Sequence, residues 1–265
     1  MNADCVTHRT FARSGYTVAR AERGLFLTLD HGLLGMSPLC NHGHADALSV
    51  TVSVKGVPFL VDTGTYRYNG APDYRKYFKG TRAHNTVTVD GRDQAIQVTS
   101  FIWGRSYQAR LTRTETRVEG LFLEVAHDGY TRLKSPVVHR RALLVGSEGS
   151  LLVRDTFSGT GSHDFEQNFH LHPEVRATRS GEWWRLEAAS VACHMRQMRG
   201  KALTLHAGEE DPPFGWHSPS YGLKVKSGVL SSRDRGPAAG VLFITAFCTG
   251  EPPGEDILKE LASGL

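Results

Sequence analysis

The fold of this chain is decided by the stretch HGHADALSVTVSVKGVPFLVD, residues 42–62. Leu48 and the valines up to Val54 alternate with serine and threonine, which predicts a strand with one buried face. The pair Lys55-Gly56 supplies a turn, and residues 57–61 return as the partner strand. The stretch therefore predicts an antiparallel hairpin with polar side chains at both of its open ends.

Those polar side chains are of the kinds that bind metals or move protons. His44 precedes the hairpin and Asp62 follows it, and the two ends of an antiparallel hairpin lie side by side. His84 stands at the start of the next predicted strand, before a second hairpin that Asp90-Gly91 is expected to close. Imidazole nitrogens and a carboxylate oxygen form a donor set that suits zinc. Asp62 and His84 can join His42 or His44 at a metal if their strands are neighbours; the alternative is a set of hydrogen-bonded polar residues at strand ends.

The rest of the chain reads as short strands separated by Gly-rich turns. Two short helices are expected, one around Tyr74, Tyr77 and Phe78, whose rings we assign to the core, and one over residues 255–262. The alternation in residues 164–172 predicts a solvated strand face that carries His170 and His172. This pattern indicates an all-β fold, a large two-sheet antiparallel β-sandwich. Its further strands are predicted at residues 106–111, 121–127, 137–145, 151–157, 164–172, 184–195, 221–230 and 241–248.

Composition agrees with one β-rich domain and narrows the partners. An apolar content of 40% over 265 residues is enough for one sizeable core. The net charge of +4 suits an anionic polysaccharide, but the basic residues are not grouped as in a nucleic-acid site, so no nucleic-acid partner is expected. No apolar run approaches the length of a membrane span.

The termini and cysteines leave the compartment open. The first residues are polar and lack the pattern of a signal peptide, so the localisation is not assigned. Cys5, Cys40, Cys193 and Cys248 form no Cys-x-x-Cys pair. They are expected to be free thiols, or to include one bridge that the sequence does not identify.

Three segments, residues 42–49, 59–66 and 77–94, resemble the heparinase II/III-like family, and more specifically the C-terminal β-sandwich domain of those polysaccharide lyases. Residues 11–20 look like the opening strand of that domain, and residues 127–130 and 137–141 fit its later strands. The resemblance covers about residues 11–250. We therefore expect an N-terminal tail over 1–10, the sandwich domain over 11–250, and a C-terminal tail over 251–265 that can contain a short helix.

The resemblance implies β-elimination at a uronic acid within an acidic polysaccharide, such as a glycosaminoglycan or alginate. By similarity, His44, Asp62 and His84 are expected to bind zinc, with Asp46 as a rival ligand on the strand face of His44. His42 and Tyr66 are expected to lie side by side in the cleft as catalytic residues, because a histidine and a tyrosine suit the proton transfers. The zinc is expected to shape the loops, since elimination needs no metal-bound hydroxide.

Complete members of this family carry a helical toroid domain before the sandwich, and nothing in this chain resembles it. The expected partners are therefore an acidic polysaccharide or oligosaccharide and a toroid domain in cis or in trans, and the chain alone is expected to show little or no lyase activity. Two alternatives stay open. One is a non-catalytic carbohydrate-binding or scaffold module, and the other is a zinc hydrolase that uses Asp46 to activate water.

Overall fold

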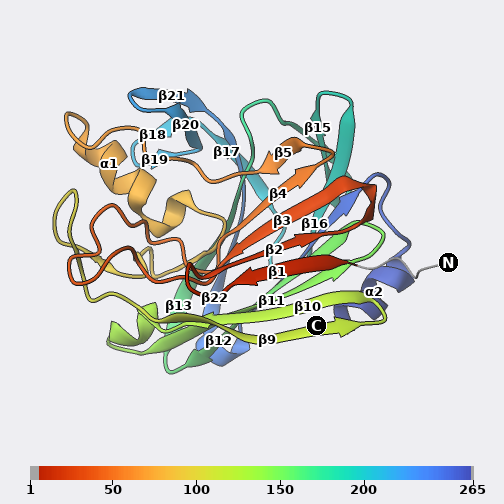
Figure 1. The fold of residues 1–265 in the computed structure, drawn as a ribbon, viewed down its shortest axis with the longest axis horizontal. Helices are drawn as coiled ribbons and strands as arrows, with labels where there is room; N and C mark the ends of the chain where they lie inside the picture. Colours follow the sequence, from red (N-terminus) through yellow and green to blue (C-terminus); the bar gives the residue numbers. More distant parts are fainter. Residues whose placement is uncertain (1–5, 264–265) are drawn as a thin grey trace.

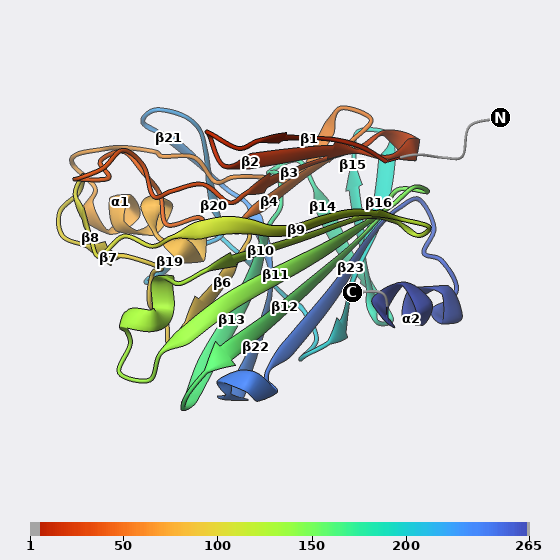
Figure 2. The same ribbon diagram turned by 60° about the horizontal axis from the view of Figure 1, so that its bottom comes forward.

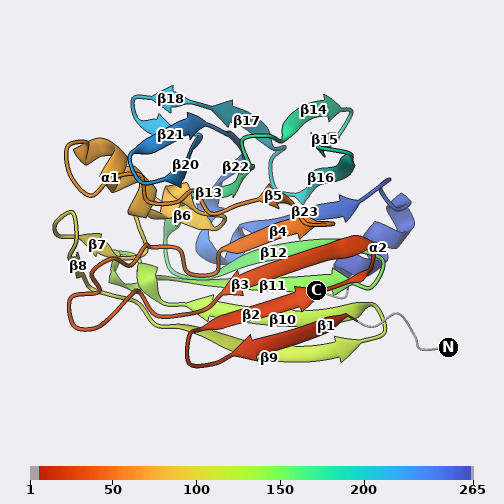
Figure 3. The same cartoon turned by 45° about the horizontal axis from the view of Figure 1, so that its top comes forward.

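A computed structural model describes residues 6–263 of the chain. Antiparallel strands form two layers that pack face to face, with a five-stranded sheet over an eight-stranded one (Figures 1 and 2). Figure 3 shows β1–β4 lying in front of β9–β12. This arrangement confirms the predicted all-β sandwich.

The front layer is built by the first quarter of the chain. Its order is β1 (Thr7–Phe11), β2 (Tyr16–Arg20), β3 (Leu25–Asp30), β4 (Val50–Val54) and β5 (Val57–Leu60). The back layer has the order β14 (Arg176–Ser180), β15 (Trp183–Ala188), β16 (Val191–Arg199), β23 (Leu242–Thr249), β12 (Ser150–Gly159), β11 (Val137–Gly146), β10 (Gly120–His127) and β9 (Ala109–Arg117).

A four-stranded sheet extends the front layer, in the order β17 (Thr204–Ala207), β22 (Gly228–Pro237), β13 (Ser162–His170) and β6 (Val87–Val89). The end of β5 joins it, because the Val61 N–H donates to the His170 carbonyl at 2.9 Å and the His172 N–H donates to the Phe59 carbonyl at 3.0 Å. Asp62 follows directly on this junction and His84 precedes β6, so the junction positions both residues.

Short elements cover the ends of the sheets. Two-stranded pairs are β7 (Ile96–Gln97) with β8 (Trp103–Gly104), β18 (Glu209–Glu210) with β19 (Pro213–Phe214), and β20 (Trp216–Ser220) with β21 (Leu223–Lys226). The helices are α1 (Pro72–Lys79), α2 (Glu255–Ser263) and the single-turn η1 (Glu22–Gly24), η2 (Thr81–Ala83), η3 (Gly129–Arg132) and η4 (Ala238–Gly240).

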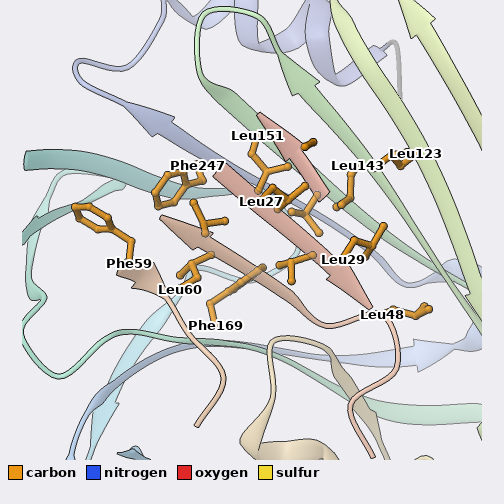
Figure 4. Close-up of a cluster of buried hydrophobic side chains, with 14 of the residues drawn as sticks. Leu27, Leu29, Leu48, Phe59, Leu60, Leu123, Leu143, Leu151, Phe169 and Phe247 are labelled. Atoms are coloured by element: carbon orange, nitrogen blue, oxygen red, sulfur yellow. The ribbon is translucent and has the colours of Figure 1, made fainter. Parts of the chain in front are cut away.

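The main core lies between the two layers. Leu27 and Leu29 of β3 face Leu123, Leu143 and Leu151 of the back sheet, and all five are fully buried (Figure 4). Burying side chains of this size contributes about 1.5–3 kcal/mol each. The hairpin predicted from residues 48–61 is confirmed: Val50, Val52 and Val54 are buried, and β4 pairs antiparallel with β5.

The structure corrects several strand predictions where a turn was not recognised. Residues 11–20 are not one strand, because the chain reverses at Gly15 between β1 and β2, and β1 already begins at Thr7. The predicted strand 184–195 is a hairpin that turns at Ala189, and the strand 221–230 is divided between β21 and β22. Asp90 and Gly91 do form a tight turn, but β6 pairs with β13 rather than with a return strand.

The predicted solvated face of residues 164–172 is also wrong. β13 lies between β22 and β6, so both of its edges are paired. Asn168 and His170 are fully buried, and only Glu166 and His172 are partly exposed among the polar residues assigned to that face. Alternation of polar and apolar residues does not show whether the polar side chains face solvent or are buried under other elements.

Cys40, Cys193 and Cys248 are buried free thiols, while Cys5 lies outside the described residues. No helix in residues 6–263 is long and apolar enough to cross a membrane.

Candidate metal centre

The structure brings together the three residues that were predicted as metal ligands. His44 lies in the loop between β3 and β4, Asp62 follows β5, and His84 ends the η2 turn. One ligand atom from each lies within 4.8 Å of the other two. The His84 Nδ1 is 2.8 Å from the Asp62 Oδ2, and the rings of His44 and His84 are 5.3 Å apart. Asp46, the predicted rival ligand, is not in this group among the described residues.

A tight turn fixes the Asp62 carboxylate. Its Oδ1 accepts the Gly64 N–H at 2.8 Å, which leaves the other oxygen directed at His84. Gly64 has a φ of 82°, and a Cβ at this position would lie 2.4 Å from the Ser218 carbonyl oxygen. Only glycine meets both requirements without strain.

Gly64→Ala is therefore expected to destabilise the fold by about 2–3 kcal/mol, from backbone strain and the close contact together. Gly70→Ala is a matched control, because Gly70 has a φ of 78° but nothing within 4 Å of its added Cβ. It is expected to cost about 1 kcal/mol. Urea unfolding of both variants measures the difference, and equal losses would show that the contact with Ser218 does not matter.

The charges around the three residues favour a cation. Asp62 and His84 form a pair. Burial would raise the pKa of Asp62, but the charge and the hydrogen bond of His84 lower it. Burial likewise opposes the charged form of His84, but Asp62, Asp46 and Asp30 raise its pKa. Burial, with His84 adding to it, lowers the pKa of His44 to about 3, so this imidazole is neutral at pH 7.

Two further carboxyl groups lie beside the centre, and the sequence had not pointed to one of them, Asp30. Burial raises the pKa of Asp46 to about 8 and also raises the pKa of Asp30. The Tyr16 side chain interacts with Asp30, and its own pKa is raised mainly by burial and then by this carboxylate. Asp30 ends β3 and lies opposite Tyr16, the first residue of the neighbouring strand β2, a placement visible only once the sheet is known.

The donor set fits a zinc ion. The His84 Nε2 is buried without a hydrogen-bond partner, which is unusual for a polar atom. His44 presents a neutral imidazole, and Asp62 presents an ionised carboxylate. Two imidazoles and one carboxylate are donors that zinc accepts, and a cation would relieve the repulsion among the nearby acids.

A cleft of about 300 Å³ opens beside this centre. His42 lines it, and Tyr16, Asp30, His44, Asp46 and Thr65 are among the other lining residues. His42 is exposed and has a φ of 64°, and its ring contacts Tyr68 and Phe101, whereas the ring of His44 contacts His84. The cleft is therefore polar, with one accessible imidazole at its edge.

The aromatic neighbour of His42 is Tyr68, whose ring lies 5.3 Å away, and Phe101 follows at 5.8 Å. Tyr68 also contacts Phe101 and the exposed Tyr221. Tyr66, which was predicted beside His42, is half-buried, and its ring contacts Tyr74 and Phe78 instead. Tyr66 has a positive φ of 63°, and Tyr68, two residues further along, is the tyrosine that reaches the His42 ring. The sequence could have offered Tyr68 as an equal candidate.

The other predicted aromatic residues are in the core, as expected. Tyr77 and Phe78 of α1 are buried with Phe214 and Trp216, and Tyr74 packs against them. His170 lies behind the centre: its Nε2 donates to the Arg82 carbonyl at 3.0 Å, and burial followed by the charge of His84 lowers its pKa to about 3. It was missed because its strand was assigned to the surface.

Comparisons with known proteins identify the family and agree with the fold. A family model described as "Heparinase II/III-like, C-terminal" matches residues 7–242. No match was found among curated proteins.

Among solved structures, a heparinase III with methylated lysines aligns with a TM-score of 0.73 at 17% identity, over 95% of this chain and 37% of that one. A mutant of the heparan sulfate lyase HepC from Pedobacter heparinus aligns with a TM-score of 0.73 at 17% identity, over 93% of this chain and 37% of that one. Identities this low show a shared fold, and the chain spans little more than a third of these proteins.

Proposed function

This chain belongs to the heparinase II/III-like C-terminal family, and from that membership we propose that it is the zinc-binding domain of a polysaccharide lyase, acting on a uronate-containing acidic polysaccharide by β-elimination. The convergence of His44, Asp62 and His84 beside a cleft that carries His42 is the observation that supports this proposal most strongly.

Zinc would be held by His44, Asp62 and His84. When bound, it would supply fixed positive charge and hold together three loops that are far apart in the sequence. His42 is two residues from His44, so the ion would also fix the backbone that presents the His42 ring.

The two proton transfers of the reaction are assigned to side chains in and beside the cleft. β-Elimination removes the C5 proton of the uronate, which is only weakly acidic, and an accessible imidazole nitrogen of His42 is suited to take it. We assign protonation of the leaving oxygen to the hydroxyl of Tyr68, because its ring lies 5.3 Å from that of His42. Tyr66, which follows the cleft residue Thr65 and is half-exposed, remains a proposed contributor.

Sugar binding is assigned to the ring cluster next to His42. Tyr68, Phe101 and Tyr221 contact one another through Tyr68, and Tyr221 is 67% exposed. Aromatic faces of this kind bind the apolar faces of sugar rings and exclude water from the reacting group. Such a platform positions a saccharide without fixing its sequence.

A lyase assay tests this function by following the absorbance of the unsaturated uronate product. The chain alone is expected to bind acidic oligosaccharides weakly with negligible turnover, because elimination needs groups on both sides of the uronate, and an error of about 1 Å costs roughly a hundredfold. Turnover is expected when a helical toroid domain is joined in cis or supplied in trans.

In that joined protein, His42→Ala should lower turnover by about 100-fold or more. His8→Ala, which removes an exposed histidine of β1, is the control and should leave turnover unchanged. Robust turnover by the isolated chain would contradict the expected need for a second domain. Binding without turnover in the joined protein would favour a carbohydrate-binding module instead.

A further inference from the structure

The structure contains a second and larger cleft, of about 740 Å³, that shares no lining residue with the cleft of His42. It lies among the turn after β6, the end of η3 and the start of β13. Its volume is within the range of roughly 300–1,000 Å³ that is usual for ligand sites. Four cationic side chains line it: Arg92, Arg105, Arg132 and Lys134.

The single carboxylate that lines this cleft is already neutralised. Asp90 accepts the His163 Nδ1–H at 2.7 Å and the Asp164 N–H at 3.0 Å. The His163 Nε2 donates to the Thr160 carbonyl at 2.9 Å, so both ring nitrogens carry protons and His163 is an imidazolium. Burial works against this charge, but the bonds to Asp90 and Thr160 outweigh it and raise the pKa of His163. The negative charge of Asp90 and the positive charge of His163 therefore cancel.

Three of the four cations are not neutralised in this way, whereas Arg132 also interacts with the charge of Asp93. Arg132 donates to the backbone carbonyls of Gln94, Gly129 and Asp93, which are neutral acceptors. The side chains of Arg92, Arg105 and Lys134 make no ion pair or hydrogen bond with any residue in the range 6–263. All three are exposed. The cleft thus concentrates uncompensated positive charge around a hollow, which attracts anions.

One segment borders both clefts. Ile96 and Arg105 line the basic cleft, while Phe101 between them contacts the ring of His42. The Trp103 indole anchors this segment to the His42 loop by donating to the Gly43 carbonyl at 2.8 Å. Residues 96–105 therefore connect the loop of His42 with the wall of the basic cleft.

We propose that this basic cleft is an extension subsite, in which Arg92, Arg105 and Lys134 bind the carboxylate or sulfate groups of an acidic polysaccharide beyond the residue held at His42. The inference rests on the proposed function, because it places the same polymer in both clefts. The subsite adds affinity for long chains and leaves short oligosaccharides to the His42 cleft.

The test compares two triple variants of the full chain that lose equal positive charge. One is Arg92→Gln, Arg105→Gln and Lys134→Gln. The control is Arg9→Gln, Lys55→Gln and Arg199→Gln, which removes exposed cations elsewhere; Lys55 and Arg105 also share a positive φ, near 50°. Titration calorimetry measures binding of heparin, which carries sulfates and carboxylates, of polyguluronate, which carries carboxylates only, and of a disaccharide from each.

We expect the cleft variant to bind the polymers about tenfold more weakly and the control variant to change by less than about twofold. Disaccharide binding should be equal in both. A loss for heparin alone would assign the subsite to sulfate, and a loss for both polymers would assign it to carboxylate.

Equal losses in the two variants would overturn the subsite, since the effect would then be one of net charge. Unchanged polymer binding in the cleft variant, with binding still reduced by His42→Ala, would overturn the subsite and leave the proposed function standing. Tighter binding of a single-stranded oligonucleotide than of either polymer would overturn the assignment to polysaccharide.

Discussion

Asp155→Asn is expected to destabilise the fold by about 3–5 kcal/mol, because it removes the countercharge of a fully buried arginine. The two carboxylate oxygens of Asp155 accept from the Arg141 Nε at 2.8 Å and from its second terminal nitrogen at 2.9 Å. His139 and Gln167 donate to the same carboxylate at 2.7 and 2.6 Å. An asparagine would turn its own NH₂ group toward these donors and leave Arg141 uncompensated.

The hydrogen-bond pattern also fixes the protons of the neighbouring histidines. His139 must donate through its Nε2 to Asp155, so its Nδ1 accepts from the His127 Nε2 at 3.2 Å. The His127 Nδ1 in turn accepts the Gly129 N–H at 3.1 Å. Both rings are therefore neutral, which agrees with pKa values that burial lowers. The network fixes a single arrangement of β10, β11 and β12.

This network predicts a definite dependence on pH. Burial would raise the pKa of Asp155, but the charge of Arg141 and the bonds to His139 lower it below the ordinary value of 3.8. The unfolded chain then takes up a proton at this position before the folded protein does. The stability that Asp155 contributes is complete above about pH 5 and is lost as the pH falls through its lowered pKa.

Urea unfolding at pH 7 and at pH 4 measures both effects. The free-energy gap between the wild type and Asp155→Asn should be largest at pH 7 and smaller at pH 4. Asp164→Asn is the control, because Asp164 is exposed and its ion pair with Arg235 is 3.7 Å long. It should cost less than about 1 kcal/mol. A similar loss in both variants would contradict the role given to the buried network.

His84→Ala is expected to abolish zinc binding and to lower the melting temperature by on the order of 10 °C. An ion present at a thousandfold excess over its Kd stabilises the folded state by about 4 kcal/mol, and about 1 kcal/mol corresponds to roughly 2–4 °C in a domain of this size. His84 is fully buried between Asp62 and His44, so no other side chain can replace it without rearrangement.

A chelator separates loss of the metal from loss of packing at His84. EDTA should lower the melting temperature of the wild type nearly to that of His84→Ala, and should have little effect on the variant itself. His206→Ala is the matched control, since His206 also pairs with a carboxylate, Glu209 at 2.6 Å, but belongs to no three-residue donor group in the described chain. It should keep its zinc and its response to EDTA. A wild type that is insensitive to EDTA would contradict the metal site.

The sandwich and the clustering of His44 with Asp62 were predictable for one physical reason. An antiparallel hairpin brings its two ends together, so the alternation of Val50, Val52 and Val54 and the short turn after them already place His44 near Asp62. The placement of His84 required more, because β6 pairs with β13, which lies about eighty residues further along the chain. The family resemblance supplied that link, and local periodicity could not.

The parts that escaped prediction depend on contacts between distant segments. The alternation of polar and apolar residues in β13 did not indicate that both faces of the strand would be covered. His170 was therefore assigned to the solvent-exposed face. Tyr68 and Phe101 are 33 positions apart in the sequence and meet only because loops from different sheets converge on His42. The basic cleft escaped for the same reason: Arg92, Arg105 and Lys134 form no run in the sequence.

Anomalous diffraction at the zinc absorption edge, from crystals of the full chain grown with zinc, tests the central claim most directly. We predict one strong anomalous peak, bonded to His44, Asp62 and His84 at about 2.0–2.2 Å, with the His42 ring open to the adjoining cleft. A zinc-edge map with no peak among these three residues, or with its peak on other ligands, would contradict the account.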